Sequence, residues 1–417
     1  MADSRPRSRT TRPVVGIARH GRLKKSNPLG AIFKVIAAAL AVTLVSGVSV
    51  GAIALAQLGS NIETVALEGE VEGPPPSLGS YEGGFNILLV GSDECESADG
   101  CAGRGGARLN DVTMLVHVSA DQSNVIAVSI PRDMVVPIPA CPREDGKGSY
   151  GAMSAQPINV TLAYGGLACT VKTVESLTGL EIPFAGLITF NGVVQMSTAV
   201  GGVTVCVDGP VVDRKANGIN LPSAGEYTIQ GVEALGFLQT RYGVGDGSDL
   251  GRISNQQVYL SSLVRKVKSE DVLTDPATLF RLATTATKSM QLSTYLANVN
   301  TMISMAAVLK DVDLDRVQFV QYPSTTGVGG VYQNKVAPIT STAEKLFSSI
   351  RADKPFNLAE GNTGRGSVAN PDAPVATPDP TATDAPAETA APQEPVETID
   401  GVLGQSAADY TCSKSNN

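Results

Sequence analysis

Charged side chains stand at the ends of apolar segments that the sequence predicts as β-strands. Asp93 closely follows one such segment, Asp111 immediately precedes a second, and Arg132 follows a third. The three segments are Phe85–Val90, Val112–Val118 and Val125–Ile130. Two carboxylates suit Mg²⁺ or Mn²⁺, because such ions use few protein ligands, and a guanidinium group suits a phosphate. The pattern therefore predicts phosphoryl chemistry, with Asp93 and Asp111 as the metal ligands.

Further arginines follow in the second half of the chain. Arg241 ends a predicted helix, and Asp249 and Arg252 lead into the next one. Arginines that are brought together need anions between them, and guanidinium groups bind phosphate oxygens through paired hydrogen bonds. Phosphoryl transfer is catalysed mostly by positioning and charge stabilisation, which these groups could supply.

Each motif also has a purely structural interpretation. An aspartate such as Asp93 after a strand is typical of a turn, and Arg132 with Asp133 is typical of a structural ion pair. His117 alternates with apolar residues, which favours a strand residue over a metal ligand. The functional interpretation therefore depends on convergence of five side chains at one surface. These are Asp93, Asp111, Arg132, Arg241 and Arg252.

Composition excludes several other classes of protein. The 417 residues carry a net charge of −8, which argues against nucleic acid as a partner. Only two histidines occur, His20 and His117, and only His117 lies in the predicted folded region. A His-rich metal site and a Ser-His-Asp triad are therefore not expected.

The N-terminal residues predict a membrane anchor. Residues 1–34 contain nine Lys or Arg and one Asp, and residues 35–58 form an uncharged, mostly apolar run of 24 residues. A helix of that length reaches about 36 Å, enough for a hydrocarbon core of roughly 30 Å. The basic head predicts a single-pass protein of the cell membrane with a cytoplasmic N-terminus and an extracytoplasmic remainder. A signal peptide cleaved after Ala54-Leu55-Ala56 is the alternative.

Strand and helix patterns alternate from residue 82 to residue 356. Two more strands are expected at Gly202–Val207 and Val317–Tyr322. Helices are expected at Ile158–Tyr164, Val171–Leu177, Val232–Thr240, Ser254–Lys268, Pro276–Lys288, Ser293–Lys310 and Thr342–Ile350. This order predicts an α/β domain with a mixed central sheet sandwiched between helices. Residues 59–81 are expected to form a stalk, and the acidic Pro/Ala/Thr-rich tail, residues 357–417, is expected to be disordered.

The six cysteines are expected to form structural disulfides, because no C-x-x-C motif occurs that would favour a metal site. Six cysteines allow 15 connectivities. Pairing of Cys95 with Cys101 is expected from their short spacing, and Cys141 with Cys169 is a weaker expectation. Cys412 could close a short docking segment after Asp400.

Seven segments, in order, resemble the LytR-CpsA-Psr family of bacterial cell-envelope proteins. They are F-N-I-L-L-V-G-S-D, R-L-N-D-V-T-M-L-V-H-V, S-I-P-R-D, I-N-V-T-L-A-Y-G-G, G-G-V-T-V, A-L-G-F-L-Q-T-R and S-D-L-G-R-I-S-N-Q-Q. A short cytoplasmic head, one transmembrane helix and an outside catalytic domain are that family's usual layout. The composition resembles that of an actinobacterial member.

The resemblance implies a phosphotransferase that moves a glycopolymer from a polyprenyl-pyrophosphate carrier to peptidoglycan or its linker. By position, Asp93 and Asp111 would be the magnesium-associated aspartates, and Asp249 would orient the arginines or help to activate the acceptor. The pyrophosphate-binding groups would be Arg108, Arg132, Arg241, Arg252 and Gln256. An apolar tunnel, lined by helices such as Val171–Leu177 and Val232–Leu238, would hold the lipid.

The chain departs from the family pattern at several of these positions. Gln239 and Asn255 stand where the family commonly has arginine, and Arg108 is displaced by one residue. The alternatives are a polyprenyl-phosphate-binding protein and a polyprenyl-pyrophosphate hydrolase without ligase activity. Arabinogalactan, teichoic acid and capsule all remain open as the glycopolymer.

Overall fold

The computed structural model describes residues 63–70, 81–93, 108–269, 272–273, 275–359, 361–370, 373 and 396–416. All described residues belong to one compact unit, Gln57–Asn417. The basic head, the apolar run at 35–58 and the Cys95–Cys101 pair lie outside the described residues. Of the helices that are described, none is both long and apolar enough to cross a bilayer.

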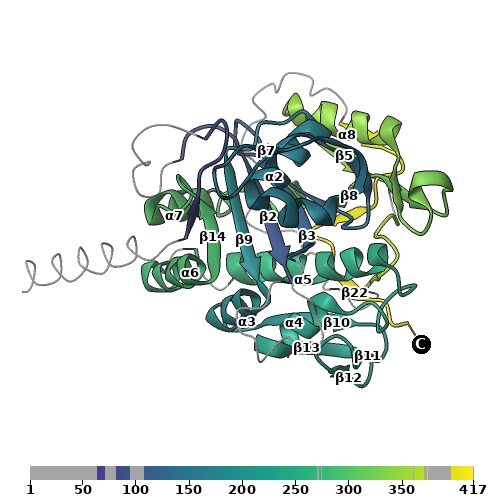
Figure 1. The fold of residues 1–417 in the computed structure, drawn as a ribbon. Helices are drawn as coiled ribbons and strands as arrows, with labels where there is room; N and C mark the ends of the chain where they lie inside the picture. The colour runs from purple at the N-terminus through teal and green to yellow at the C-terminus, as the bar shows by residue number, and fades with distance from the viewer. Residues whose placement is uncertain are drawn as a thin grey trace, which may run out of the picture. The chain divides into compact units, whose positions relative to one another are not determined.

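The apolar strand segments pair into one mixed sheet of eight strands (Figure 1). Its order is β1 (Thr64–Val65), β14 (Met290–Ser293), β9 (Phe184–Thr189), β2 (Phe85–Ser92), β3 (Asn110–Val118), β4 (Val125–Ile130), β15 (Val317–Gln321) and β21 (Gly404–Ser406). β3 runs antiparallel to β2 and β4, whereas β9 is parallel to β2 and β15 is parallel to β4. The predicted mixed sheet is therefore confirmed.

Seven helices accompany the sheet in the described part of the chain. They are α2 (Thr161–Thr178), α3 (Phe190–Ala199), α4 (Gly231–Gln239), α5 (Asp249–Ser269), α6 (Pro276–Ser289), α7 (Val299–Val308) and α8 (Thr340–Arg351). Of the helix predicted at 158–164, residues 158–160 form the 3-10 turn η2 (Ile158–Val160). The rest of it and the helix predicted at 171–177 lie within one element, α2, which is kinked at Gly165 and Gly166. The helix predicted from Ser293 is wrong at its start, because 290–293 form strand β14 and α7 begins only after the N-cap Asn298.

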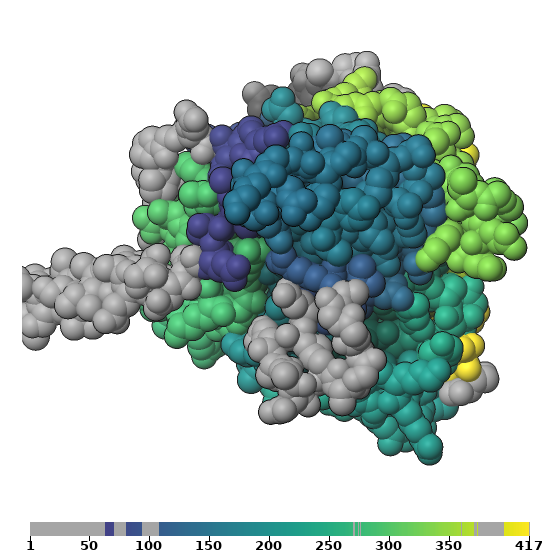
Figure 2. All heavy atoms as spheres, in the orientation of Figure 1, coloured from purple at the N-terminus to yellow at the C-terminus, as the bar shows by residue number. Residues whose placement is uncertain are grey.

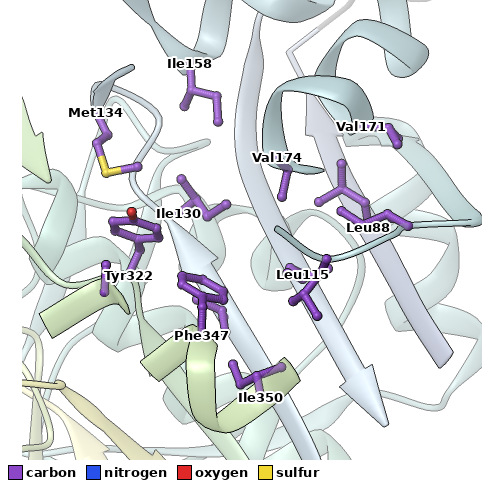
Figure 3. Packing of buried hydrophobic residues seen from close by; sticks show 14 of the residues in the cluster. Leu88, Leu115, Ile130, Met134, Ile158, Val171, Val174, Tyr322, Phe347 and Ile350 are labelled. Carbon is purple, nitrogen blue, oxygen red and sulfur yellow. The ribbon is translucent and has the colours of Figure 1, made fainter. Parts of the chain in front are cut away.

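Apolar side chains cover both faces of the sheet. Leu88, Leu115 and Val128 project to the face covered by α2 and α8, where Phe347 packs in the same cluster (Figure 3). Met114 and Phe319 project to the opposite face, toward α5 and α7. The helices therefore sandwich the sheet, as the alternation of strand and helix patterns predicts.

A second sheet has the order β13 (Gly225–Ile229), β10 (Val203–Val207), β22 (Thr411–Ser413) and β19 (Ser367–Ala369). The strand predicted at 202–207 therefore belongs to this sheet and not to the central one. Short strand pairs and single turns of 3-10 helix complete the domain. They are β5 (Val135–Ile138) with β8 (Met153–Pro157), β6 (Cys141–Pro142) with β7 (Ser149–Tyr150), β11 (Val211–Asp213) with β12 (Ile219–Leu221), β16 (Ser324–Thr326) with β17 (Val336–Pro338), β18 (Phe356–Leu358) with β20 (Glu397–Ile399), η2 (Ile158–Val160), η3 (Leu314–Arg316) and η4 (Gly330–Tyr332).

The chain ends contribute to this fold more than their composition predicts. β1 lies within the predicted stalk and pairs with β14. β21 adds to β15 in the central sheet, and β22 is joined to β10 through the disulfide Cys206–Cys412. The prediction of a disordered tail from residue 357 is therefore wrong for residues 396–416, and also for the parts of it that form β18 (Phe356–Leu358) and β19 (Ser367–Ala369). Cys141 and Cys169 form the predicted disulfide.

His117 is a strand residue, as predicted. It lies in β3, where its ring nitrogens contact Asn86 Oδ1 at 2.8 Å and Asp353 Oδ1 at 3.1 Å. Burial lowers its pKa below 6.5, and this effect outweighs the opposing effect of Asp353.

Candidate active site

The five charged side chains that were predicted to converge line one cleft of about 410 Å³, together with Asp213 and Lys215. The five are Asp93, Asp111, Arg132, Arg241 and Arg252. Because β3 runs antiparallel to β2 and β4, the end of β2, the start of β3 and the end of β4 lie at one edge of the sheet. The end of α4 and the start of α5 bring the last two arginines to this edge. The predicted convergence is therefore confirmed, whereas the chemical role of each residue stays a prediction.

Asp249 lies between three guanidinium groups at the start of α5. Its Oδ1 is 2.7 Å from Arg252 Nη2, 3.2 Å from Arg241 Nη2 and 3.9 Å from Arg132 Nε. Arg252 follows Asp249 by three residues, so both side chains lie on one face of the helix. The Asp249 side chain is only 8 % exposed. This geometry favours the orienting role predicted for Asp249, because a buried carboxylate holds the arginines together.

Asp111 links two of the arginines. Its carboxylate forms an ion pair with Arg132 Nη1, and its carbonyl oxygen accepts a hydrogen bond of 2.8 Å from Arg252 Nη2. Burial alone lowers the pKa of Arg132, but the carboxylates of Asp111 and Asp249 outweigh burial and raise that pKa. Burial lowers the pKa of Arg252. The Nε–H groups of both arginines are buried and donate no hydrogen bond within the described residues.

Asp213 is a functional candidate that the sequence reasoning missed. It is 5 % exposed, ends β11 and lines the cleft. Its Oδ2 accepts hydrogen bonds from Thr240 Oγ1 at 2.9 Å, Arg241 N at 3.3 Å and Tyr242 N at 3.2 Å. Burial alone raises the pKa of Asp213, but these hydrogen bonds lower it below 3.8 overall. The available signal was an aspartate that directly follows two β-branched apolar residues, Val211 and Val212.

Two of the predicted pyrophosphate-binding residues lie elsewhere. Arg108 is not among the residues that line the cleft, and its guanidinium donates to Glu144 Oε1 at 2.7 Å and Gln291 Oε1 at 3.3 Å. Gln256 donates to Leu238 O at 2.9 Å and lines an apolar cavity beside the cleft. Arg108 is therefore not placed with the three clustered arginines, whereas Gln256 lines the adjoining cavity together with Arg252.

The two departures from the family pattern have different surroundings. Gln239 lines the cleft, and its Oε1 accepts a hydrogen bond from Asn217 Nδ2. Asn255 is fully buried, donates to Phe237 O at 2.5 Å and accepts from Ser413 Oγ at 2.5 Å. Asn255 thus links α5 to α4 and to the C-terminal strand β22, which is a structural role.

Asp93 and Asp111 are the side chains that could hold a metal ion. Both line the cleft, and Asp93 Oδ1 also accepts a hydrogen bond of 3.1 Å from Leu109 N. The described residues include no group of three or more His, Cys, Asp or Glu side chains suited to a metal. Mg²⁺ commonly uses one or two carboxylates together with substrate phosphates. The donor set therefore fits a magnesium ion that is bound jointly with a phosphate ligand.

Two apolar cavities lie next to the cleft. The first, about 180 Å³, shares Asp111 and Arg252 with the cleft and is lined by apolar residues of β2, β3, α3, α4 and α5. The second, about 310 Å³, shares Val193 and Leu238 with the first and extends between α3, α5 and α6. Of the two helices that the resemblance implied for a lipid tunnel, α4 lines the cavities, whereas 171–177 pack on the other face of the sheet.

The cleft is formed by parts of the chain that are far apart in sequence. In Figure 2 the blue part of the chain borders the teal part. The cleft residues from the two regions are far apart in sequence, since Asp111 and Arg252 are separated by 141 positions.

Comparison with known proteins places this geometry in context. The model of the LytR_cpsA_psr family matches residues 53–348. The chain is 29 % identical over 318 residues to the cell wall biosynthesis protein LcpA of Corynebacterium glutamicum, covering 70 % of this chain and 60 % of that protein. It is 32 % identical over 189 residues to the polyisoprenyl-teichoic acid–peptidoglycan teichoic acid transferase TagU of Oceanobacillus iheyensis, covering 45 % and 53 %. The chain thus matches 53–60 % of the length of these two relatives.

A solved structure also resembles the fold. A protein from Streptococcus agalactiae matches 65 % of this chain and 88 % of its own, with a TM-score of 0.51 and 19 % sequence identity. At this identity the likeness supports the fold alone.

Proposed function

The chain belongs to the LytR-CpsA-Psr family, and we propose that it is a phosphotransferase of cell wall assembly. It moves a glycopolymer from a polyprenyl-pyrophosphate carrier to peptidoglycan or its linker and forms a phosphodiester bond. The proposal extends to this chain the activity that the name of the Oceanobacillus relative describes.

One observation carries the proposal: three clustered arginines line a cleft that adjoins apolar cavities. Arg132, Arg241 and Arg252 line the cleft, and Arg252 also lines the cavity of about 180 Å³. Guanidinium groups bind phosphate oxygens, and an apolar cavity accommodates a prenyl chain. A lipid pyrophosphate combines both chemistries in one molecule, so it fits the cleft and the cavities together.

The reaction follows from the position of the pyrophosphate. An acceptor hydroxyl oxygen attacks the phosphorus nearest the sugar and forms a new P–O bond. The bond from that phosphorus to the bridging oxygen breaks, and polyprenyl phosphate leaves. The hydroxyl proton passes to solvent, because Asp93 and Asp111 are assigned to the metal ion. The arginines stabilise the charge that develops on the transferred phosphoryl group.

A divalent cation completes the charge balance of this proposal. Asp111 and Asp249 already pair with the clustered arginines, so a bound pyrophosphate brings negative charge in excess. Asp93 and Asp111 would hold Mg²⁺ or Mn²⁺ there, and the ion would supply charge neutralisation at the phosphates.

The proposed setting is the outer surface of the cell membrane. Residues 35–58 anchor the chain in the bilayer with the N-terminus in the cytoplasm, and the catalytic domain lies outside. There the lipid-linked glycan and the peptidoglycan acceptor are both accessible. Arabinogalactan is one candidate glycopolymer, because the composition of the chain resembles that of an actinobacterial member.

The test uses the full-length chain in detergent with a polyprenyl-pyrophosphate-linked disaccharide, a peptidoglycan fragment and Mg²⁺. Polyprenyl phosphate is measured by chromatography and the new phosphodiester by mass spectrometry. We expect Arg132→Ala to lower the rate about 100-fold or more, because it removes a group that stabilises the transition state. Arg316→Ala is the matched control, since the Arg316 side chain is 45 % exposed and, among the described residues, forms an ion pair only with its neighbour Asp315, at 3.9 Å.

The alternatives give different outcomes in the same assay. Release of polyprenyl phosphate that needs no acceptor would indicate a hydrolase. Tight binding of the lipid without release under any condition would indicate a carrier-binding protein. Chelation of the metal should stop release by the wild-type protein, and Asp93→Ala or Asp111→Ala should have a similar effect.

A further inference from the structure

An exposed aromatic ring stands at the mouth of the cleft. Tyr242 directly follows Arg241, is 59 % exposed and lines the cleft. The other large apolar side chains that are strongly exposed in the described part of the chain, Tyr410 among them, do not line it. Single exposed aromatics are common on protein surfaces, so exposure alone assigns no role to Tyr242.

The backbone around Tyr242 is held from two sides. Its N–H donates to Asp213 Oδ2 at 3.2 Å, and its carbonyl oxygen accepts from Asn416 Nδ2 at 3.0 Å. The carbonyl of Gly243 accepts a hydrogen bond from Asn416 N at 3.2 Å. The segment that carries the ring is thus fixed by β11 and by the C-terminal residues. A ring on a fixed backbone loses little conformational freedom when a ligand binds.

A cation is positioned against the same ring. Lys215 lines the cleft, and its Nζ lies 4.5 Å from the centre of the Tyr242 ring. No ion pair joins this ammonium group to a carboxylate among the described residues. Asp213 connects the two residues, because its Oδ1 accepts from Lys215 N at 2.9 Å while its Oδ2 accepts from Tyr242 N. One buried carboxylate therefore sets the positions of the ring and the cation relative to Arg241.

We propose that Tyr242 and Lys215 form a subsite for the sugar ring attached to the pyrophosphate. The C–H face of a hexose packs on an aromatic ring, and the ammonium group donates hydrogen bonds to sugar hydroxyl or phosphate oxygens. The subsite rests on the proposed function, since Arg241 beside it is assigned to the pyrophosphate. It makes Tyr242 a specificity-determining residue that distinguishes glycosylated from bare carrier lipid.

The test compares two ligands with the full-length chain in detergent. One is polyprenyl pyrophosphate, and the other is the same lipid carrying a single hexose. The measured quantity is the ratio of the two dissociation constants, obtained by titration calorimetry. Wild-type protein should bind the hexose-bearing lipid more tightly. Tyr242→Ala should reduce this preference about fivefold to tenfold, and Lys215→Ala about twofold to threefold.

Two further variants make the result specific. Tyr242→Phe should keep the preference within about twofold, because stacking needs the ring and not the hydroxyl. Tyr410→Ala is the matched control: Tyr410 is 40 % exposed and has the Arg265 guanidinium 4.5 Å from its ring, but it does not line the cleft. The Tyr410→Ala protein should prefer the hexose-bearing lipid as strongly as the wild type does.

The proposal is overturned if Tyr242→Ala retains the wild-type preference, or if Tyr410→Ala loses as much preference as Tyr242→Ala. It is also overturned if Tyr242→Phe loses as much as Tyr242→Ala, since a hydrogen bond would then replace stacking. Failure of the proposed function looks different, because the wild-type protein would then form no phosphodiester with the peptidoglycan fragment, whatever its preference between the two lipids. Thermal unfolding of each variant identifies a loss of structure, and Tyr242→Phe tests the subsite even if Tyr242→Ala unfolds.

Discussion

The two faces of the central sheet are built from the same strands but are covered differently. On the α2 and α8 face, Leu88, Leu115 and Val128 are 0 % exposed and pack in one continuous cluster (Figure 3). On the α5 and α7 face, Leu89 and Met114 border a cavity of about 180 Å³, and a second cavity of about 310 Å³ adjoins it. Since cavities cost stability, their presence on the face beside the arginines supports the proposal that this face accommodates a ligand.

The largest effect we expect is a loss of stability when a side chain is removed from the α2 and α8 face, which we call the packed face. Phe347→Ala should lower the free energy of unfolding by about 3–5 kcal/mol, because the removed ring leaves a cavity among fully buried neighbours. Leu238→Ala changes the α5 and α7 face, which we call the hollow face because the two cavities lie on it. This variant should lower the free energy of unfolding by about 1–2 kcal/mol, since Leu238 already borders both cavities. Urea denaturation of the two variants measures the difference. Equal costs would contradict the contrast between the faces.

An intermediate effect, on lipid binding, is expected when a side chain that borders the cavities is enlarged. Val193 lies on α3 and borders both cavities, so Val193→Trp should fill space that a prenyl chain would occupy. Binding of polyprenyl pyrophosphate should weaken about tenfold or more, while the free energy of unfolding changes by less than about 1 kcal/mol. The matched change on the packed face, Val128→Trp, should destabilise the fold by about 1–3 kcal/mol or more. Unaltered lipid binding by Val193→Trp would show that the cavities do not hold the lipid.

The contrast between the two faces of the central sheet could not be predicted from the sequence. The β2 residues Ile87–Val90 are apolar at every position, so they show that both faces are covered but not which face is hollow. That difference depends on how α3 and α6 pack, which involves contacts between residues far apart in the chain. The same reason explains Arg108, whose partners Glu144 and Gln291 lie 36 and 183 positions away.

The site residues were easier to predict than the chain ends. The end of β2 and the start of β3 meet because the strands are adjacent and antiparallel, so a local pattern was sufficient to bring Asp93 and Asp111 together. No local sequence pattern predicts the C-terminal strand β22, because it is structured by its pairing with β10 and by the disulfide Cys206–Cys412. Composition alone therefore predicts disorder where distant partners supply the structure.

The smallest effect we expect is a dependence of stability on pH that arises on the packed face. His117 projects to the same side of β3 as Leu115, and burial holds its pKa below 6.5 in the folded protein. The unfolded chain therefore binds more protons as the pH falls below about 6.5, so the free energy of unfolding decreases. His117→Gln should remove this part of the dependence, an effect of about 1 kcal/mol or less between pH 7 and pH 5.

Urea denaturation at several pH values measures this effect as the difference in free energy of unfolding between wild type and variant. The difference cancels the contribution of carboxylates such as Glu175, whose pKa is raised mainly by burial. Because the hollow face contributes no histidine among the described residues, the difference should be unchanged when the cavities are filled by Val193→Trp. A difference that disappears in the Val193→Trp background would show that the two faces are coupled rather than independent.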